Sequence, residues 1–413
     1  MPDWKRCDFS RLLIQPTRLR PGWLIRTLDS LKHNTQIKLG LSILYPPRIT
    51  LYDASASLMC LSENLLMFTA LDLFCGAGGL TCGLKMAGFD VLAGVELNSV
   101  AAETYRTNYP DHKLYEADIT TLSPESVMAE LGLKKGELDL LAGCPPCQGF
   151  SSHRTRNKSS SVDDFRNELA FEFLRFVETF LPKTVMMENV PALAKDHRIN
   201  IIIDKLTKLG YVVNDDTVSI KDCSDYDVPQ RRKRMILIAS RLGVIEHPQK
   251  SENKITVRDA IGGMENNFNS IDPLHKSSSK HSDKVMMIIK SVPKDGGSRS
   301  QIPYSLWLDC HKKNPNSYRD VYGRMSWDNV APTITGGCVN PSKGRFIHPS
   351  EDRTITLREA ALIQSFPSDY YFSMRRGKES AALMIGNALP PKFIMKHALE
   401  FIKHLENAGG IRE

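Results

Sequence analysis

The stretch from Gly143 to Ser151 holds the residues of this sequence that are best suited to chemistry. It reads Gly-Cys-Pro-Pro-Cys-Gln-Gly-Phe-Ser and follows a short apolar run, so Cys147 would lie at the carboxyl end of a strand, on a stiff proline turn. Cys144 and Cys147 also have the spacing of zinc or redox pairs, but no second Cys or His pair with ligand spacing lies nearby. We therefore interpret Cys147 as a single nucleophile whose thiolate is favoured by cations and backbone amides, and we expect no bound metal.

Glu188 ends a second apolar run, 184–187, which predicts a half-buried carboxyl with a raised pKa. Such a group suits proton donation to a ring nitrogen. A surface carboxylate at a strand end is the alternative.

The run Gln-Arg-Arg-Lys-Arg at 230–234 leads into a third apolar segment. On a strand, Arg232 and Arg234 would point to one face, and Arg231 and Lys233 to the other. One face could serve a site while the other meets solvent or phosphate, although a run of charges is more often a solvated edge.

A glycine-rich turn at 72–80 follows an expected strand and opens an expected helix, so backbone can approach a ligand closely there. Glu96 lies 18 residues beyond Gly78, at the end of the next expected strand, where a carboxylate can hold ribose hydroxyls. Because Gly79 directly follows Gly78, the spacing favours a nucleoside cofactor over a dinucleotide. Asp118, at another expected strand end, could accept from an adenine amino group or cap a helix.

Together these motifs resemble, in their order, the motifs of the DNA cytosine-5 methyltransferases of the bacterial, S-adenosylmethionine-dependent type. The resemblance runs from about Leu71 to His404 and weakens across 240–330. Each motif alone is ambiguous, whereas the ordered set is specific. Many members carry glycine where this chain has Cys144, a small departure. The motifs are Asp72–Leu80, Glu96, Asp118, Pro145–Gln148, Glu188–Val190, Gln230–Arg234, Ala331–Thr335, Arg358–Pro367 and Gly386–Pro391.

The resemblance implies methyl transfer from S-adenosylmethionine to C5 of cytosine in a specific double-stranded DNA sequence. It implies a covalent bond between Cys147 and C6 of a base flipped out of the duplex, with Glu188 acting at N3. Arg232 would orient the base, and Arg234 would support the site from behind. Such an enzyme fits the modification half of a restriction-modification system, and standalone methylation is equally compatible.

The resemblance also assigns binding residues. Cofactor contacts are expected from Phe74, Gly76, Ala77, Gly78, Gly79, Glu96, Leu97, Asp118, Ile119, Pro146, Asn387 and Ala388. DNA contacts are expected from Gln148, Ser151, Arg154, Arg156 and Thr333. The polar, basic segment 151–158 follows the nucleophile directly, as a loop that closes over DNA should. We expect a monomer that requires no protein partner, with a cognate restriction endonuclease acting on the same site as an option.

The elements that must position these residues are short apolar runs that alternate with helix-like stretches between 67 and 240. This alternation predicts an α/β domain with a mostly parallel sheet. The resemblance implies that the domain is Rossmann-like and that a smaller irregular target-recognition domain accompanies it. A helix is expected from Phe165 to Leu181. Strands are expected at Leu71–Phe74, Val91–Val95, Leu138–Ala142, Thr184–Met187 and Arg234–Ala239.

Composition suggests four segments. Residues 1–66 are basic and proline-interrupted, which indicates an extension of unknown role or sequence upstream of a native start at Met67. Residues 67–240 form the catalytic and cofactor-binding domain. Residues 241–355 carry 17 basic and 12 acidic side chains and one expected short helix, Asp283–Val292, which suggests a separate irregular domain. By the resemblance, this segment would be the target-recognition domain. Residues 356–413 return to helical spacing and to the catalytic domain.

A chain of 413 residues with 41% hydrophobic and 24% charged residues is long enough for two or three domains with a real core. It contains no apolar run of membrane-spanning length, no secretory signal, and nine cysteines, an odd number that does not suggest a disulfide framework. We therefore expect a protein of the bacterial cytoplasm, associated with the nucleoid through DNA.

Three alternatives stay open. A tRNA cytosine-5 methyltransferase is disfavoured by the basic insert of about 115 residues and by the lack of a Cys-Phe-Thr signature. A non-enzymatic DNA-binding relative is disfavoured by the intact Cys147, Glu188, Arg232 and Asn387. A nicotinamide oxidoreductase is disfavoured by the glycine spacing.

Overall fold

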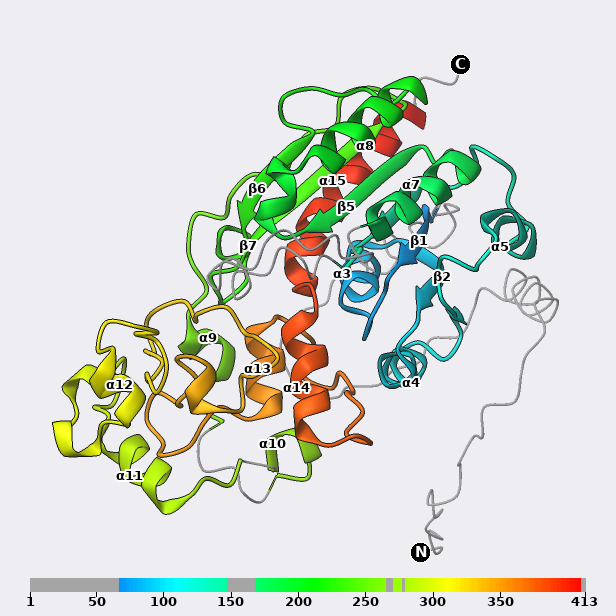
Figure 1. Ribbon diagram of the computed structural model, residues 1–413. Helices are drawn as coiled ribbons and strands as arrows, with labels where there is room; N and C mark the ends of the chain where they lie inside the picture. Colours follow the sequence, from blue (N-terminus) through cyan, green and yellow to red (C-terminus); the bar gives the residue numbers. More distant parts are fainter. Residues whose placement is uncertain (1–66, 147–167, 265–269, 277–278, 410–413) are drawn as a thin grey trace, which may run out of the picture. The chain divides into compact units, whose positions relative to one another are not determined.

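The computed structural model describes residues 67–146, 168–264, 270–276 and 279–409 (Figure 1). The expected extension at 1–66 and the segment 147–167, which begins with Cys147, lie outside these residues.

A seven-stranded sheet forms the centre of the described chain and confirms the predicted α/β fold with a mostly parallel sheet. The strand order is β3-β2-β1-β4-β5-β7-β6. The first five strands in this order are parallel to one another, whereas β7 is antiparallel to both β5 and β6. The strands are β1 (Thr69–Leu73), β2 (Asp90–Glu96), β3 (Lys113–Glu116), β4 (Leu140–Gly143), β5 (Thr184–Asn189), β6 (Val218–Asp222) and β7 (Lys233–Ser240).

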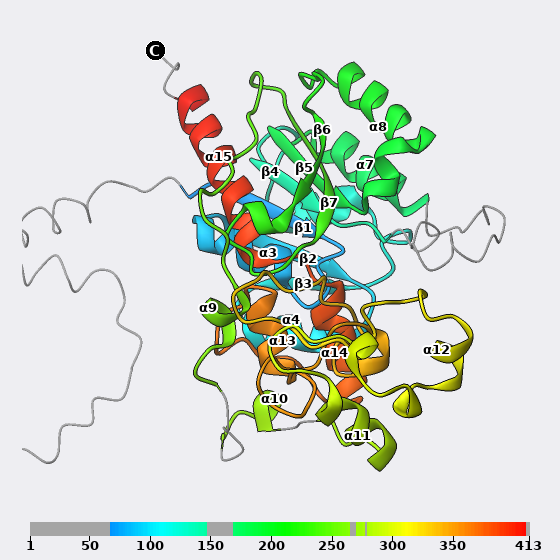
Figure 2. The ribbon, with the colours of Figure 1, turned by 90° about the vertical axis from the view of Figure 1, so that its left-hand side faces the viewer.

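Helices cover both faces of the sheet (Figure 2). They are α3 (Gly79–Ala87), α4 (Ser99–Asn108), α5 (Pro124–Glu130), α7 (Leu169–Phe180), α8 (His197–Lys208) and α15 (Pro391–Gly409). Successive residues of β1 point to opposite faces, as a strand requires. Ala70 packs into the core under α3 and α15, and Leu71 packs into the core under α5, α7 and α8. The helix expected from Phe165 to Leu181 is present as α7 over its described part.

The described part of 241–355 is built differently, from short helices and turns without a strand of the sheet. One of its helices matches the short helix expected at Asp283–Val292. A small core around Ile289 and Tyr322 lies within this segment. The helices are α9 (Val257–Ile261), α10 (Pro273–Lys276), α11 (Asp283–Ser291) and α12 (Asp309–Lys313), with 3₁₀ turns η5 (Arg299–Gln301), η6 (Tyr304–Leu306) and η7 (Pro341–Lys343). Two further 3₁₀ turns lie between strands, η3 (Pro191–Lys195) and η4 (Cys223–Asp225).

The C-terminal segment, residues 356–409, contributes helices to two different cores. Helices α13 (Leu357–Ile363) and α14 (Lys378–Asn387) contribute to a core that also contains residues of α9 and α10, while α15 packs on α3. The chain thus crosses from one core to the other at 388–390, between α14 and α15. None of the helices in the described ranges is long and apolar enough to cross a membrane.

Candidate active site

The strand order reverses at β1, which pairs with β2 on one side and with β4 on the other. The loops that leave the carboxyl ends of β1 and β4 run to opposite sides of the sheet. Open α/β sheets bind ligands in the crevice between two such loops. Three groups of predicted residues follow these ends. The glycine loop follows Leu73, Glu96 ends β2, and Pro146 comes three residues after Gly143.

The glycine loop, residues 74–79, turns sharply through three left-handed residues. The φ angle is 61° at Phe74, 55° at Gly76 and 90° at Gly78, which is the N-cap of α3. Phe74 is the one non-glycine residue among them and so holds a conformation that side chains rarely adopt. The loop therefore presents its backbone at the sheet edge in a conformation that requires left-handed φ angles, which residues other than glycine rarely adopt.

The C-terminal motif returns to this loop. A Cβ on Gly79 would lie 2.6 Å from the carbonyl oxygen of Leu389 and 3.3 Å from the Cβ of Ala388, so only glycine fits there. Ala388 is half-buried against the loop and Asn387 is exposed beside it. Two sets of predicted cofactor residues, more than 300 positions apart in sequence, are thus brought together.

Glu96 ties the glycine loop to the start of α4. Its Oε2 accepts from the backbone N–H of Gly76 at 2.9 Å, and its Oε1 accepts from that of Asn98 at 2.6 Å. Burial raises the pKa of Glu96, opposed by these backbone hydrogen bonds. Next to it, the side chain of Leu97 is 66% exposed.

Asp118 is exposed two residues after β3. Its Oδ1 accepts from both the backbone N–H (3.0 Å) and the hydroxyl (2.8 Å) of Thr120, and these bonds lower its pKa. These bonds close a turn at Asp118–Thr121 and cap no helix, because the next helix, α5, begins at Pro124 with Ser123 as its N-cap. The helix-cap alternative for Asp118 is therefore wrong. The neighbouring Ile119 is buried in the core of the sheet.

Glu188 has the buried position and the raised pKa predicted for it. It is 7% exposed near the end of β5, and burial raises its pKa against the opposing charges of Arg234 and Arg232. Arg234 Nε lies 2.7 Å from Glu188 Oε1. Burial, followed by the charge of the Glu188 carboxylate, keeps the pKa of the Cys144 thiol well above its usual range.

The Arg232 side chain is buried, and its guanidinium group donates hydrogen bonds to backbone carbonyl groups. Its Nη1 donates to the carbonyl oxygen of Ile334 and its Nη2 to that of Gly386, both at 2.9 Å. Burial lowers its pKa to about 9. The two arginines thus have different partners, because Arg232 lies just before β7 beside Ile334, whereas Arg234 contacts Glu188.

Five predicted residues, Cys147, Gln148, Ser151, Arg154 and Arg156, lie outside the described part of the chain. The turn that leads to them is anchored, since Asn189 Nδ2 donates to the carbonyl oxygen of Pro145 at 2.9 Å. Thr333 is half-buried, and its hydroxyl donates to the carbonyl oxygen of Arg231 at 2.6 Å.

Two tyrosines that the sequence analysis missed hold the outer side of the glycine loop. The Tyr370 hydroxyl donates to the carbonyl oxygen of Ala77 at 2.6 Å, and that of Tyr109 to the carbonyl oxygen of Gly78 at 3.5 Å. The signal that could have indicated Tyr370 is its place, three residues after Pro367 of a recognised motif.

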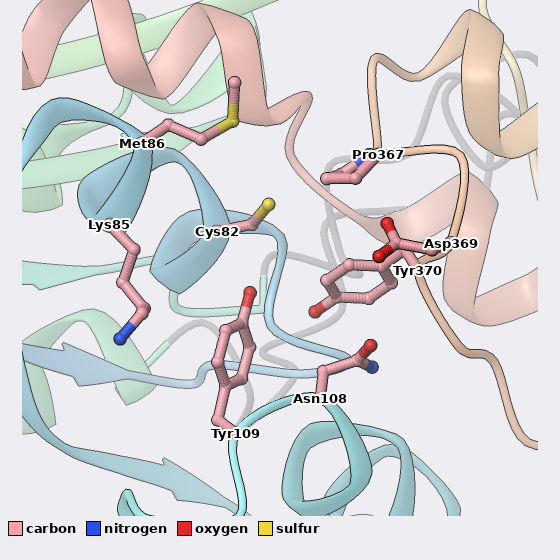
Figure 3. A pocket seen from close by; sticks show the side chains of 8 residues that line it. All are labelled: Cys82, Lys85, Met86, Asn108, Tyr109, Pro367, Asp369 and Tyr370. Atoms are coloured by element: carbon pink, nitrogen blue, oxygen red, sulfur yellow. The ribbon is translucent and has the colours of Figure 1, made fainter. Parts of the chain in front are cut away.

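Behind these tyrosines lies a pocket of about 340 Å³, which none of the predicted site residues lines (Figure 3). Its walls are Cys82, Lys85, Met86, Asn108, Tyr109, Pro367, Asp369 and Tyr370.

Comparison with known proteins identifies the family. The sequence model described as C-5 cytosine-specific DNA methylase matches residues 68–403. The chain belongs to this family. It is a DNA cytosine-5-methyltransferase, and the nicotinamide oxidoreductase alternative is wrong.

Relatives of this methylase cover nearly the same length. It is 36% identical to the Type II methylase M.HgiDII of Herpetosiphon aurantiacus over 365 residues, 83% of this chain and 98% of the relative. It is 34% identical to the Type II methyltransferase M1.HphI of Haemophilus parahaemolyticus over 360 residues, 85% and 91% of the two chains.

Solved structures share the fold of this methylase. A chain described as a DNA modification methyltransferase encoded within an Escherichia coli prophage superposes with a TM-score of 0.64 at 25% identity, covering 82% of this chain and 99% of that one. The Entamoeba histolytica methyltransferase EhMeth superposes with a TM-score of 0.58 at 16% identity and the same coverage, which shows the fold alone.

Proposed function

We propose that this methylase transfers a methyl group from S-adenosylmethionine to C5 of a cytosine within a specific double-stranded DNA sequence. The observation that supports this most is the environment of Glu188. The carboxyl is buried beside Arg234 at the carboxyl end of β5, and β5 neighbours β4, whose loop leads through Pro145 and Pro146 to Cys147.

The carboxyl edge of the sheet at β1 suits a nucleoside cofactor. The glycine loop brings backbone to the sheet edge, Glu96 lies one strand away with both oxygens positioned by backbone amides, and Leu97 offers an exposed apolar surface. We assign the cofactor to the loop residues Phe74 and Gly76–Gly79, to Glu96–Leu97, to Asp118–Ile119, to Pro146 and to Asn387–Ala388. When bound there, S-adenosylmethionine supplies the methyl group.

In the mechanism we propose, the Cys147 thiolate adds to C6 of the cytosine while Glu188 gives a proton to N3. The new bond to C6 moves electron density to C5, which makes C5 nucleophilic. After methylation, loss of the C5 proton and departure of Cys147 restore the aromatic ring. Arg234 fixes the Glu188 carboxyl, and Cys144, whose thiol stays protonated, can donate to it.

The proposed attack on C6 and methylation of C5 also determine how the enzyme must bind DNA. C5 and C6 cannot be reached inside a duplex, so the base must be flipped into the site at a cost of a few kcal/mol. We assign sequence reading to 241–355, including Thr333, and closure over the DNA to Gln148, Ser151, Arg154 and Arg156. The basic excess of 241–355 suits phosphate contacts, which position the protein without specifying sequence.

Two relatives carry Type II names, which supports a place in a restriction-modification system. We propose that this methylase acts as a monomer and protects the site of a separate endonuclease, because methylating one flipped base needs one active site.

Bisulfite sequencing tests the proposal. DNA from a methylation-free host that expresses the chain should contain modified cytosines in one short sequence context, and a Cys147→Ser variant should leave none. Unmodified DNA beside modified tRNA, with folded protein, would contradict it. A parallel expression of residues 67–413 tests whether the first 66 residues are needed.

A further inference from the structure

Two fully buried glutamines join three parts of the chain. Gln230 lies just before β7, and Gln364 is the C-cap of α13. The amide nitrogen of Gln230 donates to the side-chain oxygen of Gln364 and, at 3.3 Å, to the carbonyl oxygen of Ile363. Burying two uncharged amides in an apolar core costs free energy unless their hydrogen bonds are made, so each is committed to its partners.

The first part that this pair holds is the segment Ala331–Gly336. Gln230 Oε1 accepts from the backbone N–H of Ile334 at 2.9 Å, and Arg232 Nη1 donates to the carbonyl oxygen of the same residue. Both polar groups of Ile334 are therefore fixed by side chains of the 230–234 run. Ile334 follows Thr333, which we assign to the DNA side of the enzyme.

The second part is the end of α14. The last carbonyl groups of a helix have no partner within it. Here Gln364 Nε2 donates to the carbonyl oxygen of Ile385 and, at 3.3 Å, to that of Ala388, and Arg232 Nη2 donates to that of Gly386. Ile385 and Gly386 directly precede Asn387 and Ala388, which we assign to the cofactor.

The two parts also touch directly. A Cβ on Gly386 would lie 2.1 Å from the carbonyl carbon of Thr335 and 2.2 Å from the backbone nitrogen of Gly336. Backbone therefore meets backbone, without side chains between them to absorb a shift. A displacement of 331–336 must move the end of α14 or break hydrogen bonds of buried amides.

We propose that Gln230 and Gln364 are positioning residues that couple DNA binding at 331–336 to cofactor binding at 387–388. This inference rests on the proposed function, which places DNA at the first segment and the cofactor at the second. Occupation of either site fixes the shared network, so each ligand tightens the other by the same factor.

The test measures the affinity of the full chain for S-adenosylhomocysteine by calorimetry, with and without a saturating duplex that carries the sequence found by bisulfite mapping. In the wild type we expect the duplex to tighten this affinity by roughly 5- to 100-fold, the usual range for coupled sites. In Gln364→Met, which keeps the volume and removes both donors to α14, the ratio should fall to about twofold or less. The affinity without DNA should change much less than the ratio.

Tyr211→Phe is the matched control, because it also removes one buried hydrogen bond, to the carbonyl oxygen of Pro182, in the core under α5, α7 and α8 and not in the core that contains α13 and α14. It should keep the wild-type ratio. If Gln364→Met does not fold, Gln364→Asn serves, since its shorter amide cannot span Gln230 and α14.

An unchanged ratio in a folded Gln364 variant would overturn the inference. So would a wild type that methylates the duplex yet binds S-adenosylhomocysteine equally with and without it. The second result leaves the proposed function intact, whereas a wild type that methylates no DNA counts against that function first.

Discussion

Arg234 Nε lies 2.7 Å from Glu188 Oε1, across the antiparallel pair of β7 and β5. The contact is an ion pair without the alignment of a hydrogen bond, which leaves Oε1 without an aligned donor. Burial raises the pKa of Glu188, and the nearby guanidinium groups oppose that rise. The proton affinity of this carboxyl is therefore a balance that one substitution can shift.

Arg234→Gln should move that balance in a known direction. Without the guanidinium the pKa of Glu188 rises further, so the protonated form persists to higher pH. If this form gives the proton to N3, the alkaline limb of the kcat/KM profile moves up in pH, while the maximum falls by about 100-fold because the carboxyl loses its orientation. A methylation assay across pH 6–10 measures both effects.

Lys233→Gln is the control for this experiment, since it removes the same charge from the opposite, exposed face of β7. It should leave the position of the alkaline limb unchanged. A limb that moves equally in both variants would mean that net charge, not the pair with Glu188, sets the profile.

Tyr370→Phe should weaken cofactor binding without unfolding the protein. It removes the hydrogen bond from the Tyr370 hydroxyl to the carbonyl oxygen of Ala77, which holds the glycine loop from behind. One such bond contributes about 0.5–1.5 kcal/mol, so the Kd for S-adenosylhomocysteine should rise by roughly 2- to 10-fold. Calorimetry measures it, and Tyr211→Phe, whose lost bond is far from the loop, should bind as the wild type does.

The sequence predicted the central strands and missed those at the edges for a physical reason. β1, β4, β5 and β7 are buried on both faces and therefore read as apolar runs, which is the signal used. β3 and β6 are the edge strands, and their side chains are mostly half-exposed, so Lys113–Glu116 and Val218–Asp222 show no such run.

Site residues were predictable where a motif carries its own geometry. The left-handed turn at Gly76 and Gly78 and the carboxylate of Glu96 are local features of a strand end. The different partners of Arg232 and Arg234 were not predictable, because alternation places both on one face, and Ile334, which Arg232 contacts, is 102 positions away. The hydrogen bond from Tyr370 to the carbonyl oxygen of Ala77 joins residues 293 positions apart and was not predictable for the same reason, because it depends on the tertiary structure.

Gly386→Ala should destabilise the protein. The added methyl would lie 2.1 Å from the backbone of Thr335 and 2.2 Å from the nitrogen of Gly336, and backbone on both sides cannot give way as a flexible side chain would. Overpacking of this kind costs about 1–3 kcal/mol or more. Thermal unfolding should show Tm lowered by several degrees. Gly409→Ala, where nothing lies within 4 Å of the new methyl, should leave Tm unchanged, and a Gly386→Ala variant as stable as that control would contradict the packing seen here.

His397 should make the fold sensitive to acid. The side chain is buried in α15, where its Nδ1 bonds to the carbonyl oxygen of Phe393, and burial lowers its pKa to about 3, with His247 and Lys221 also opposing protonation. The unfolded chain takes up this proton near pH 6.5 and the folded chain does not, so stability falls as pH falls from 6.5 toward 3.

This single group should cost about 2 kcal/mol between pH 7 and pH 5. Urea unfolding at the two pH values measures the loss. His397→Gln, which cannot titrate, should lose about 2 kcal/mol less over the same interval, whatever its stability at pH 7. His197→Gln, which removes a histidine side chain at an exposed position, should keep the wild-type loss. Equal pH dependence in the wild type and His397→Gln would show that the acid sensitivity arises elsewhere.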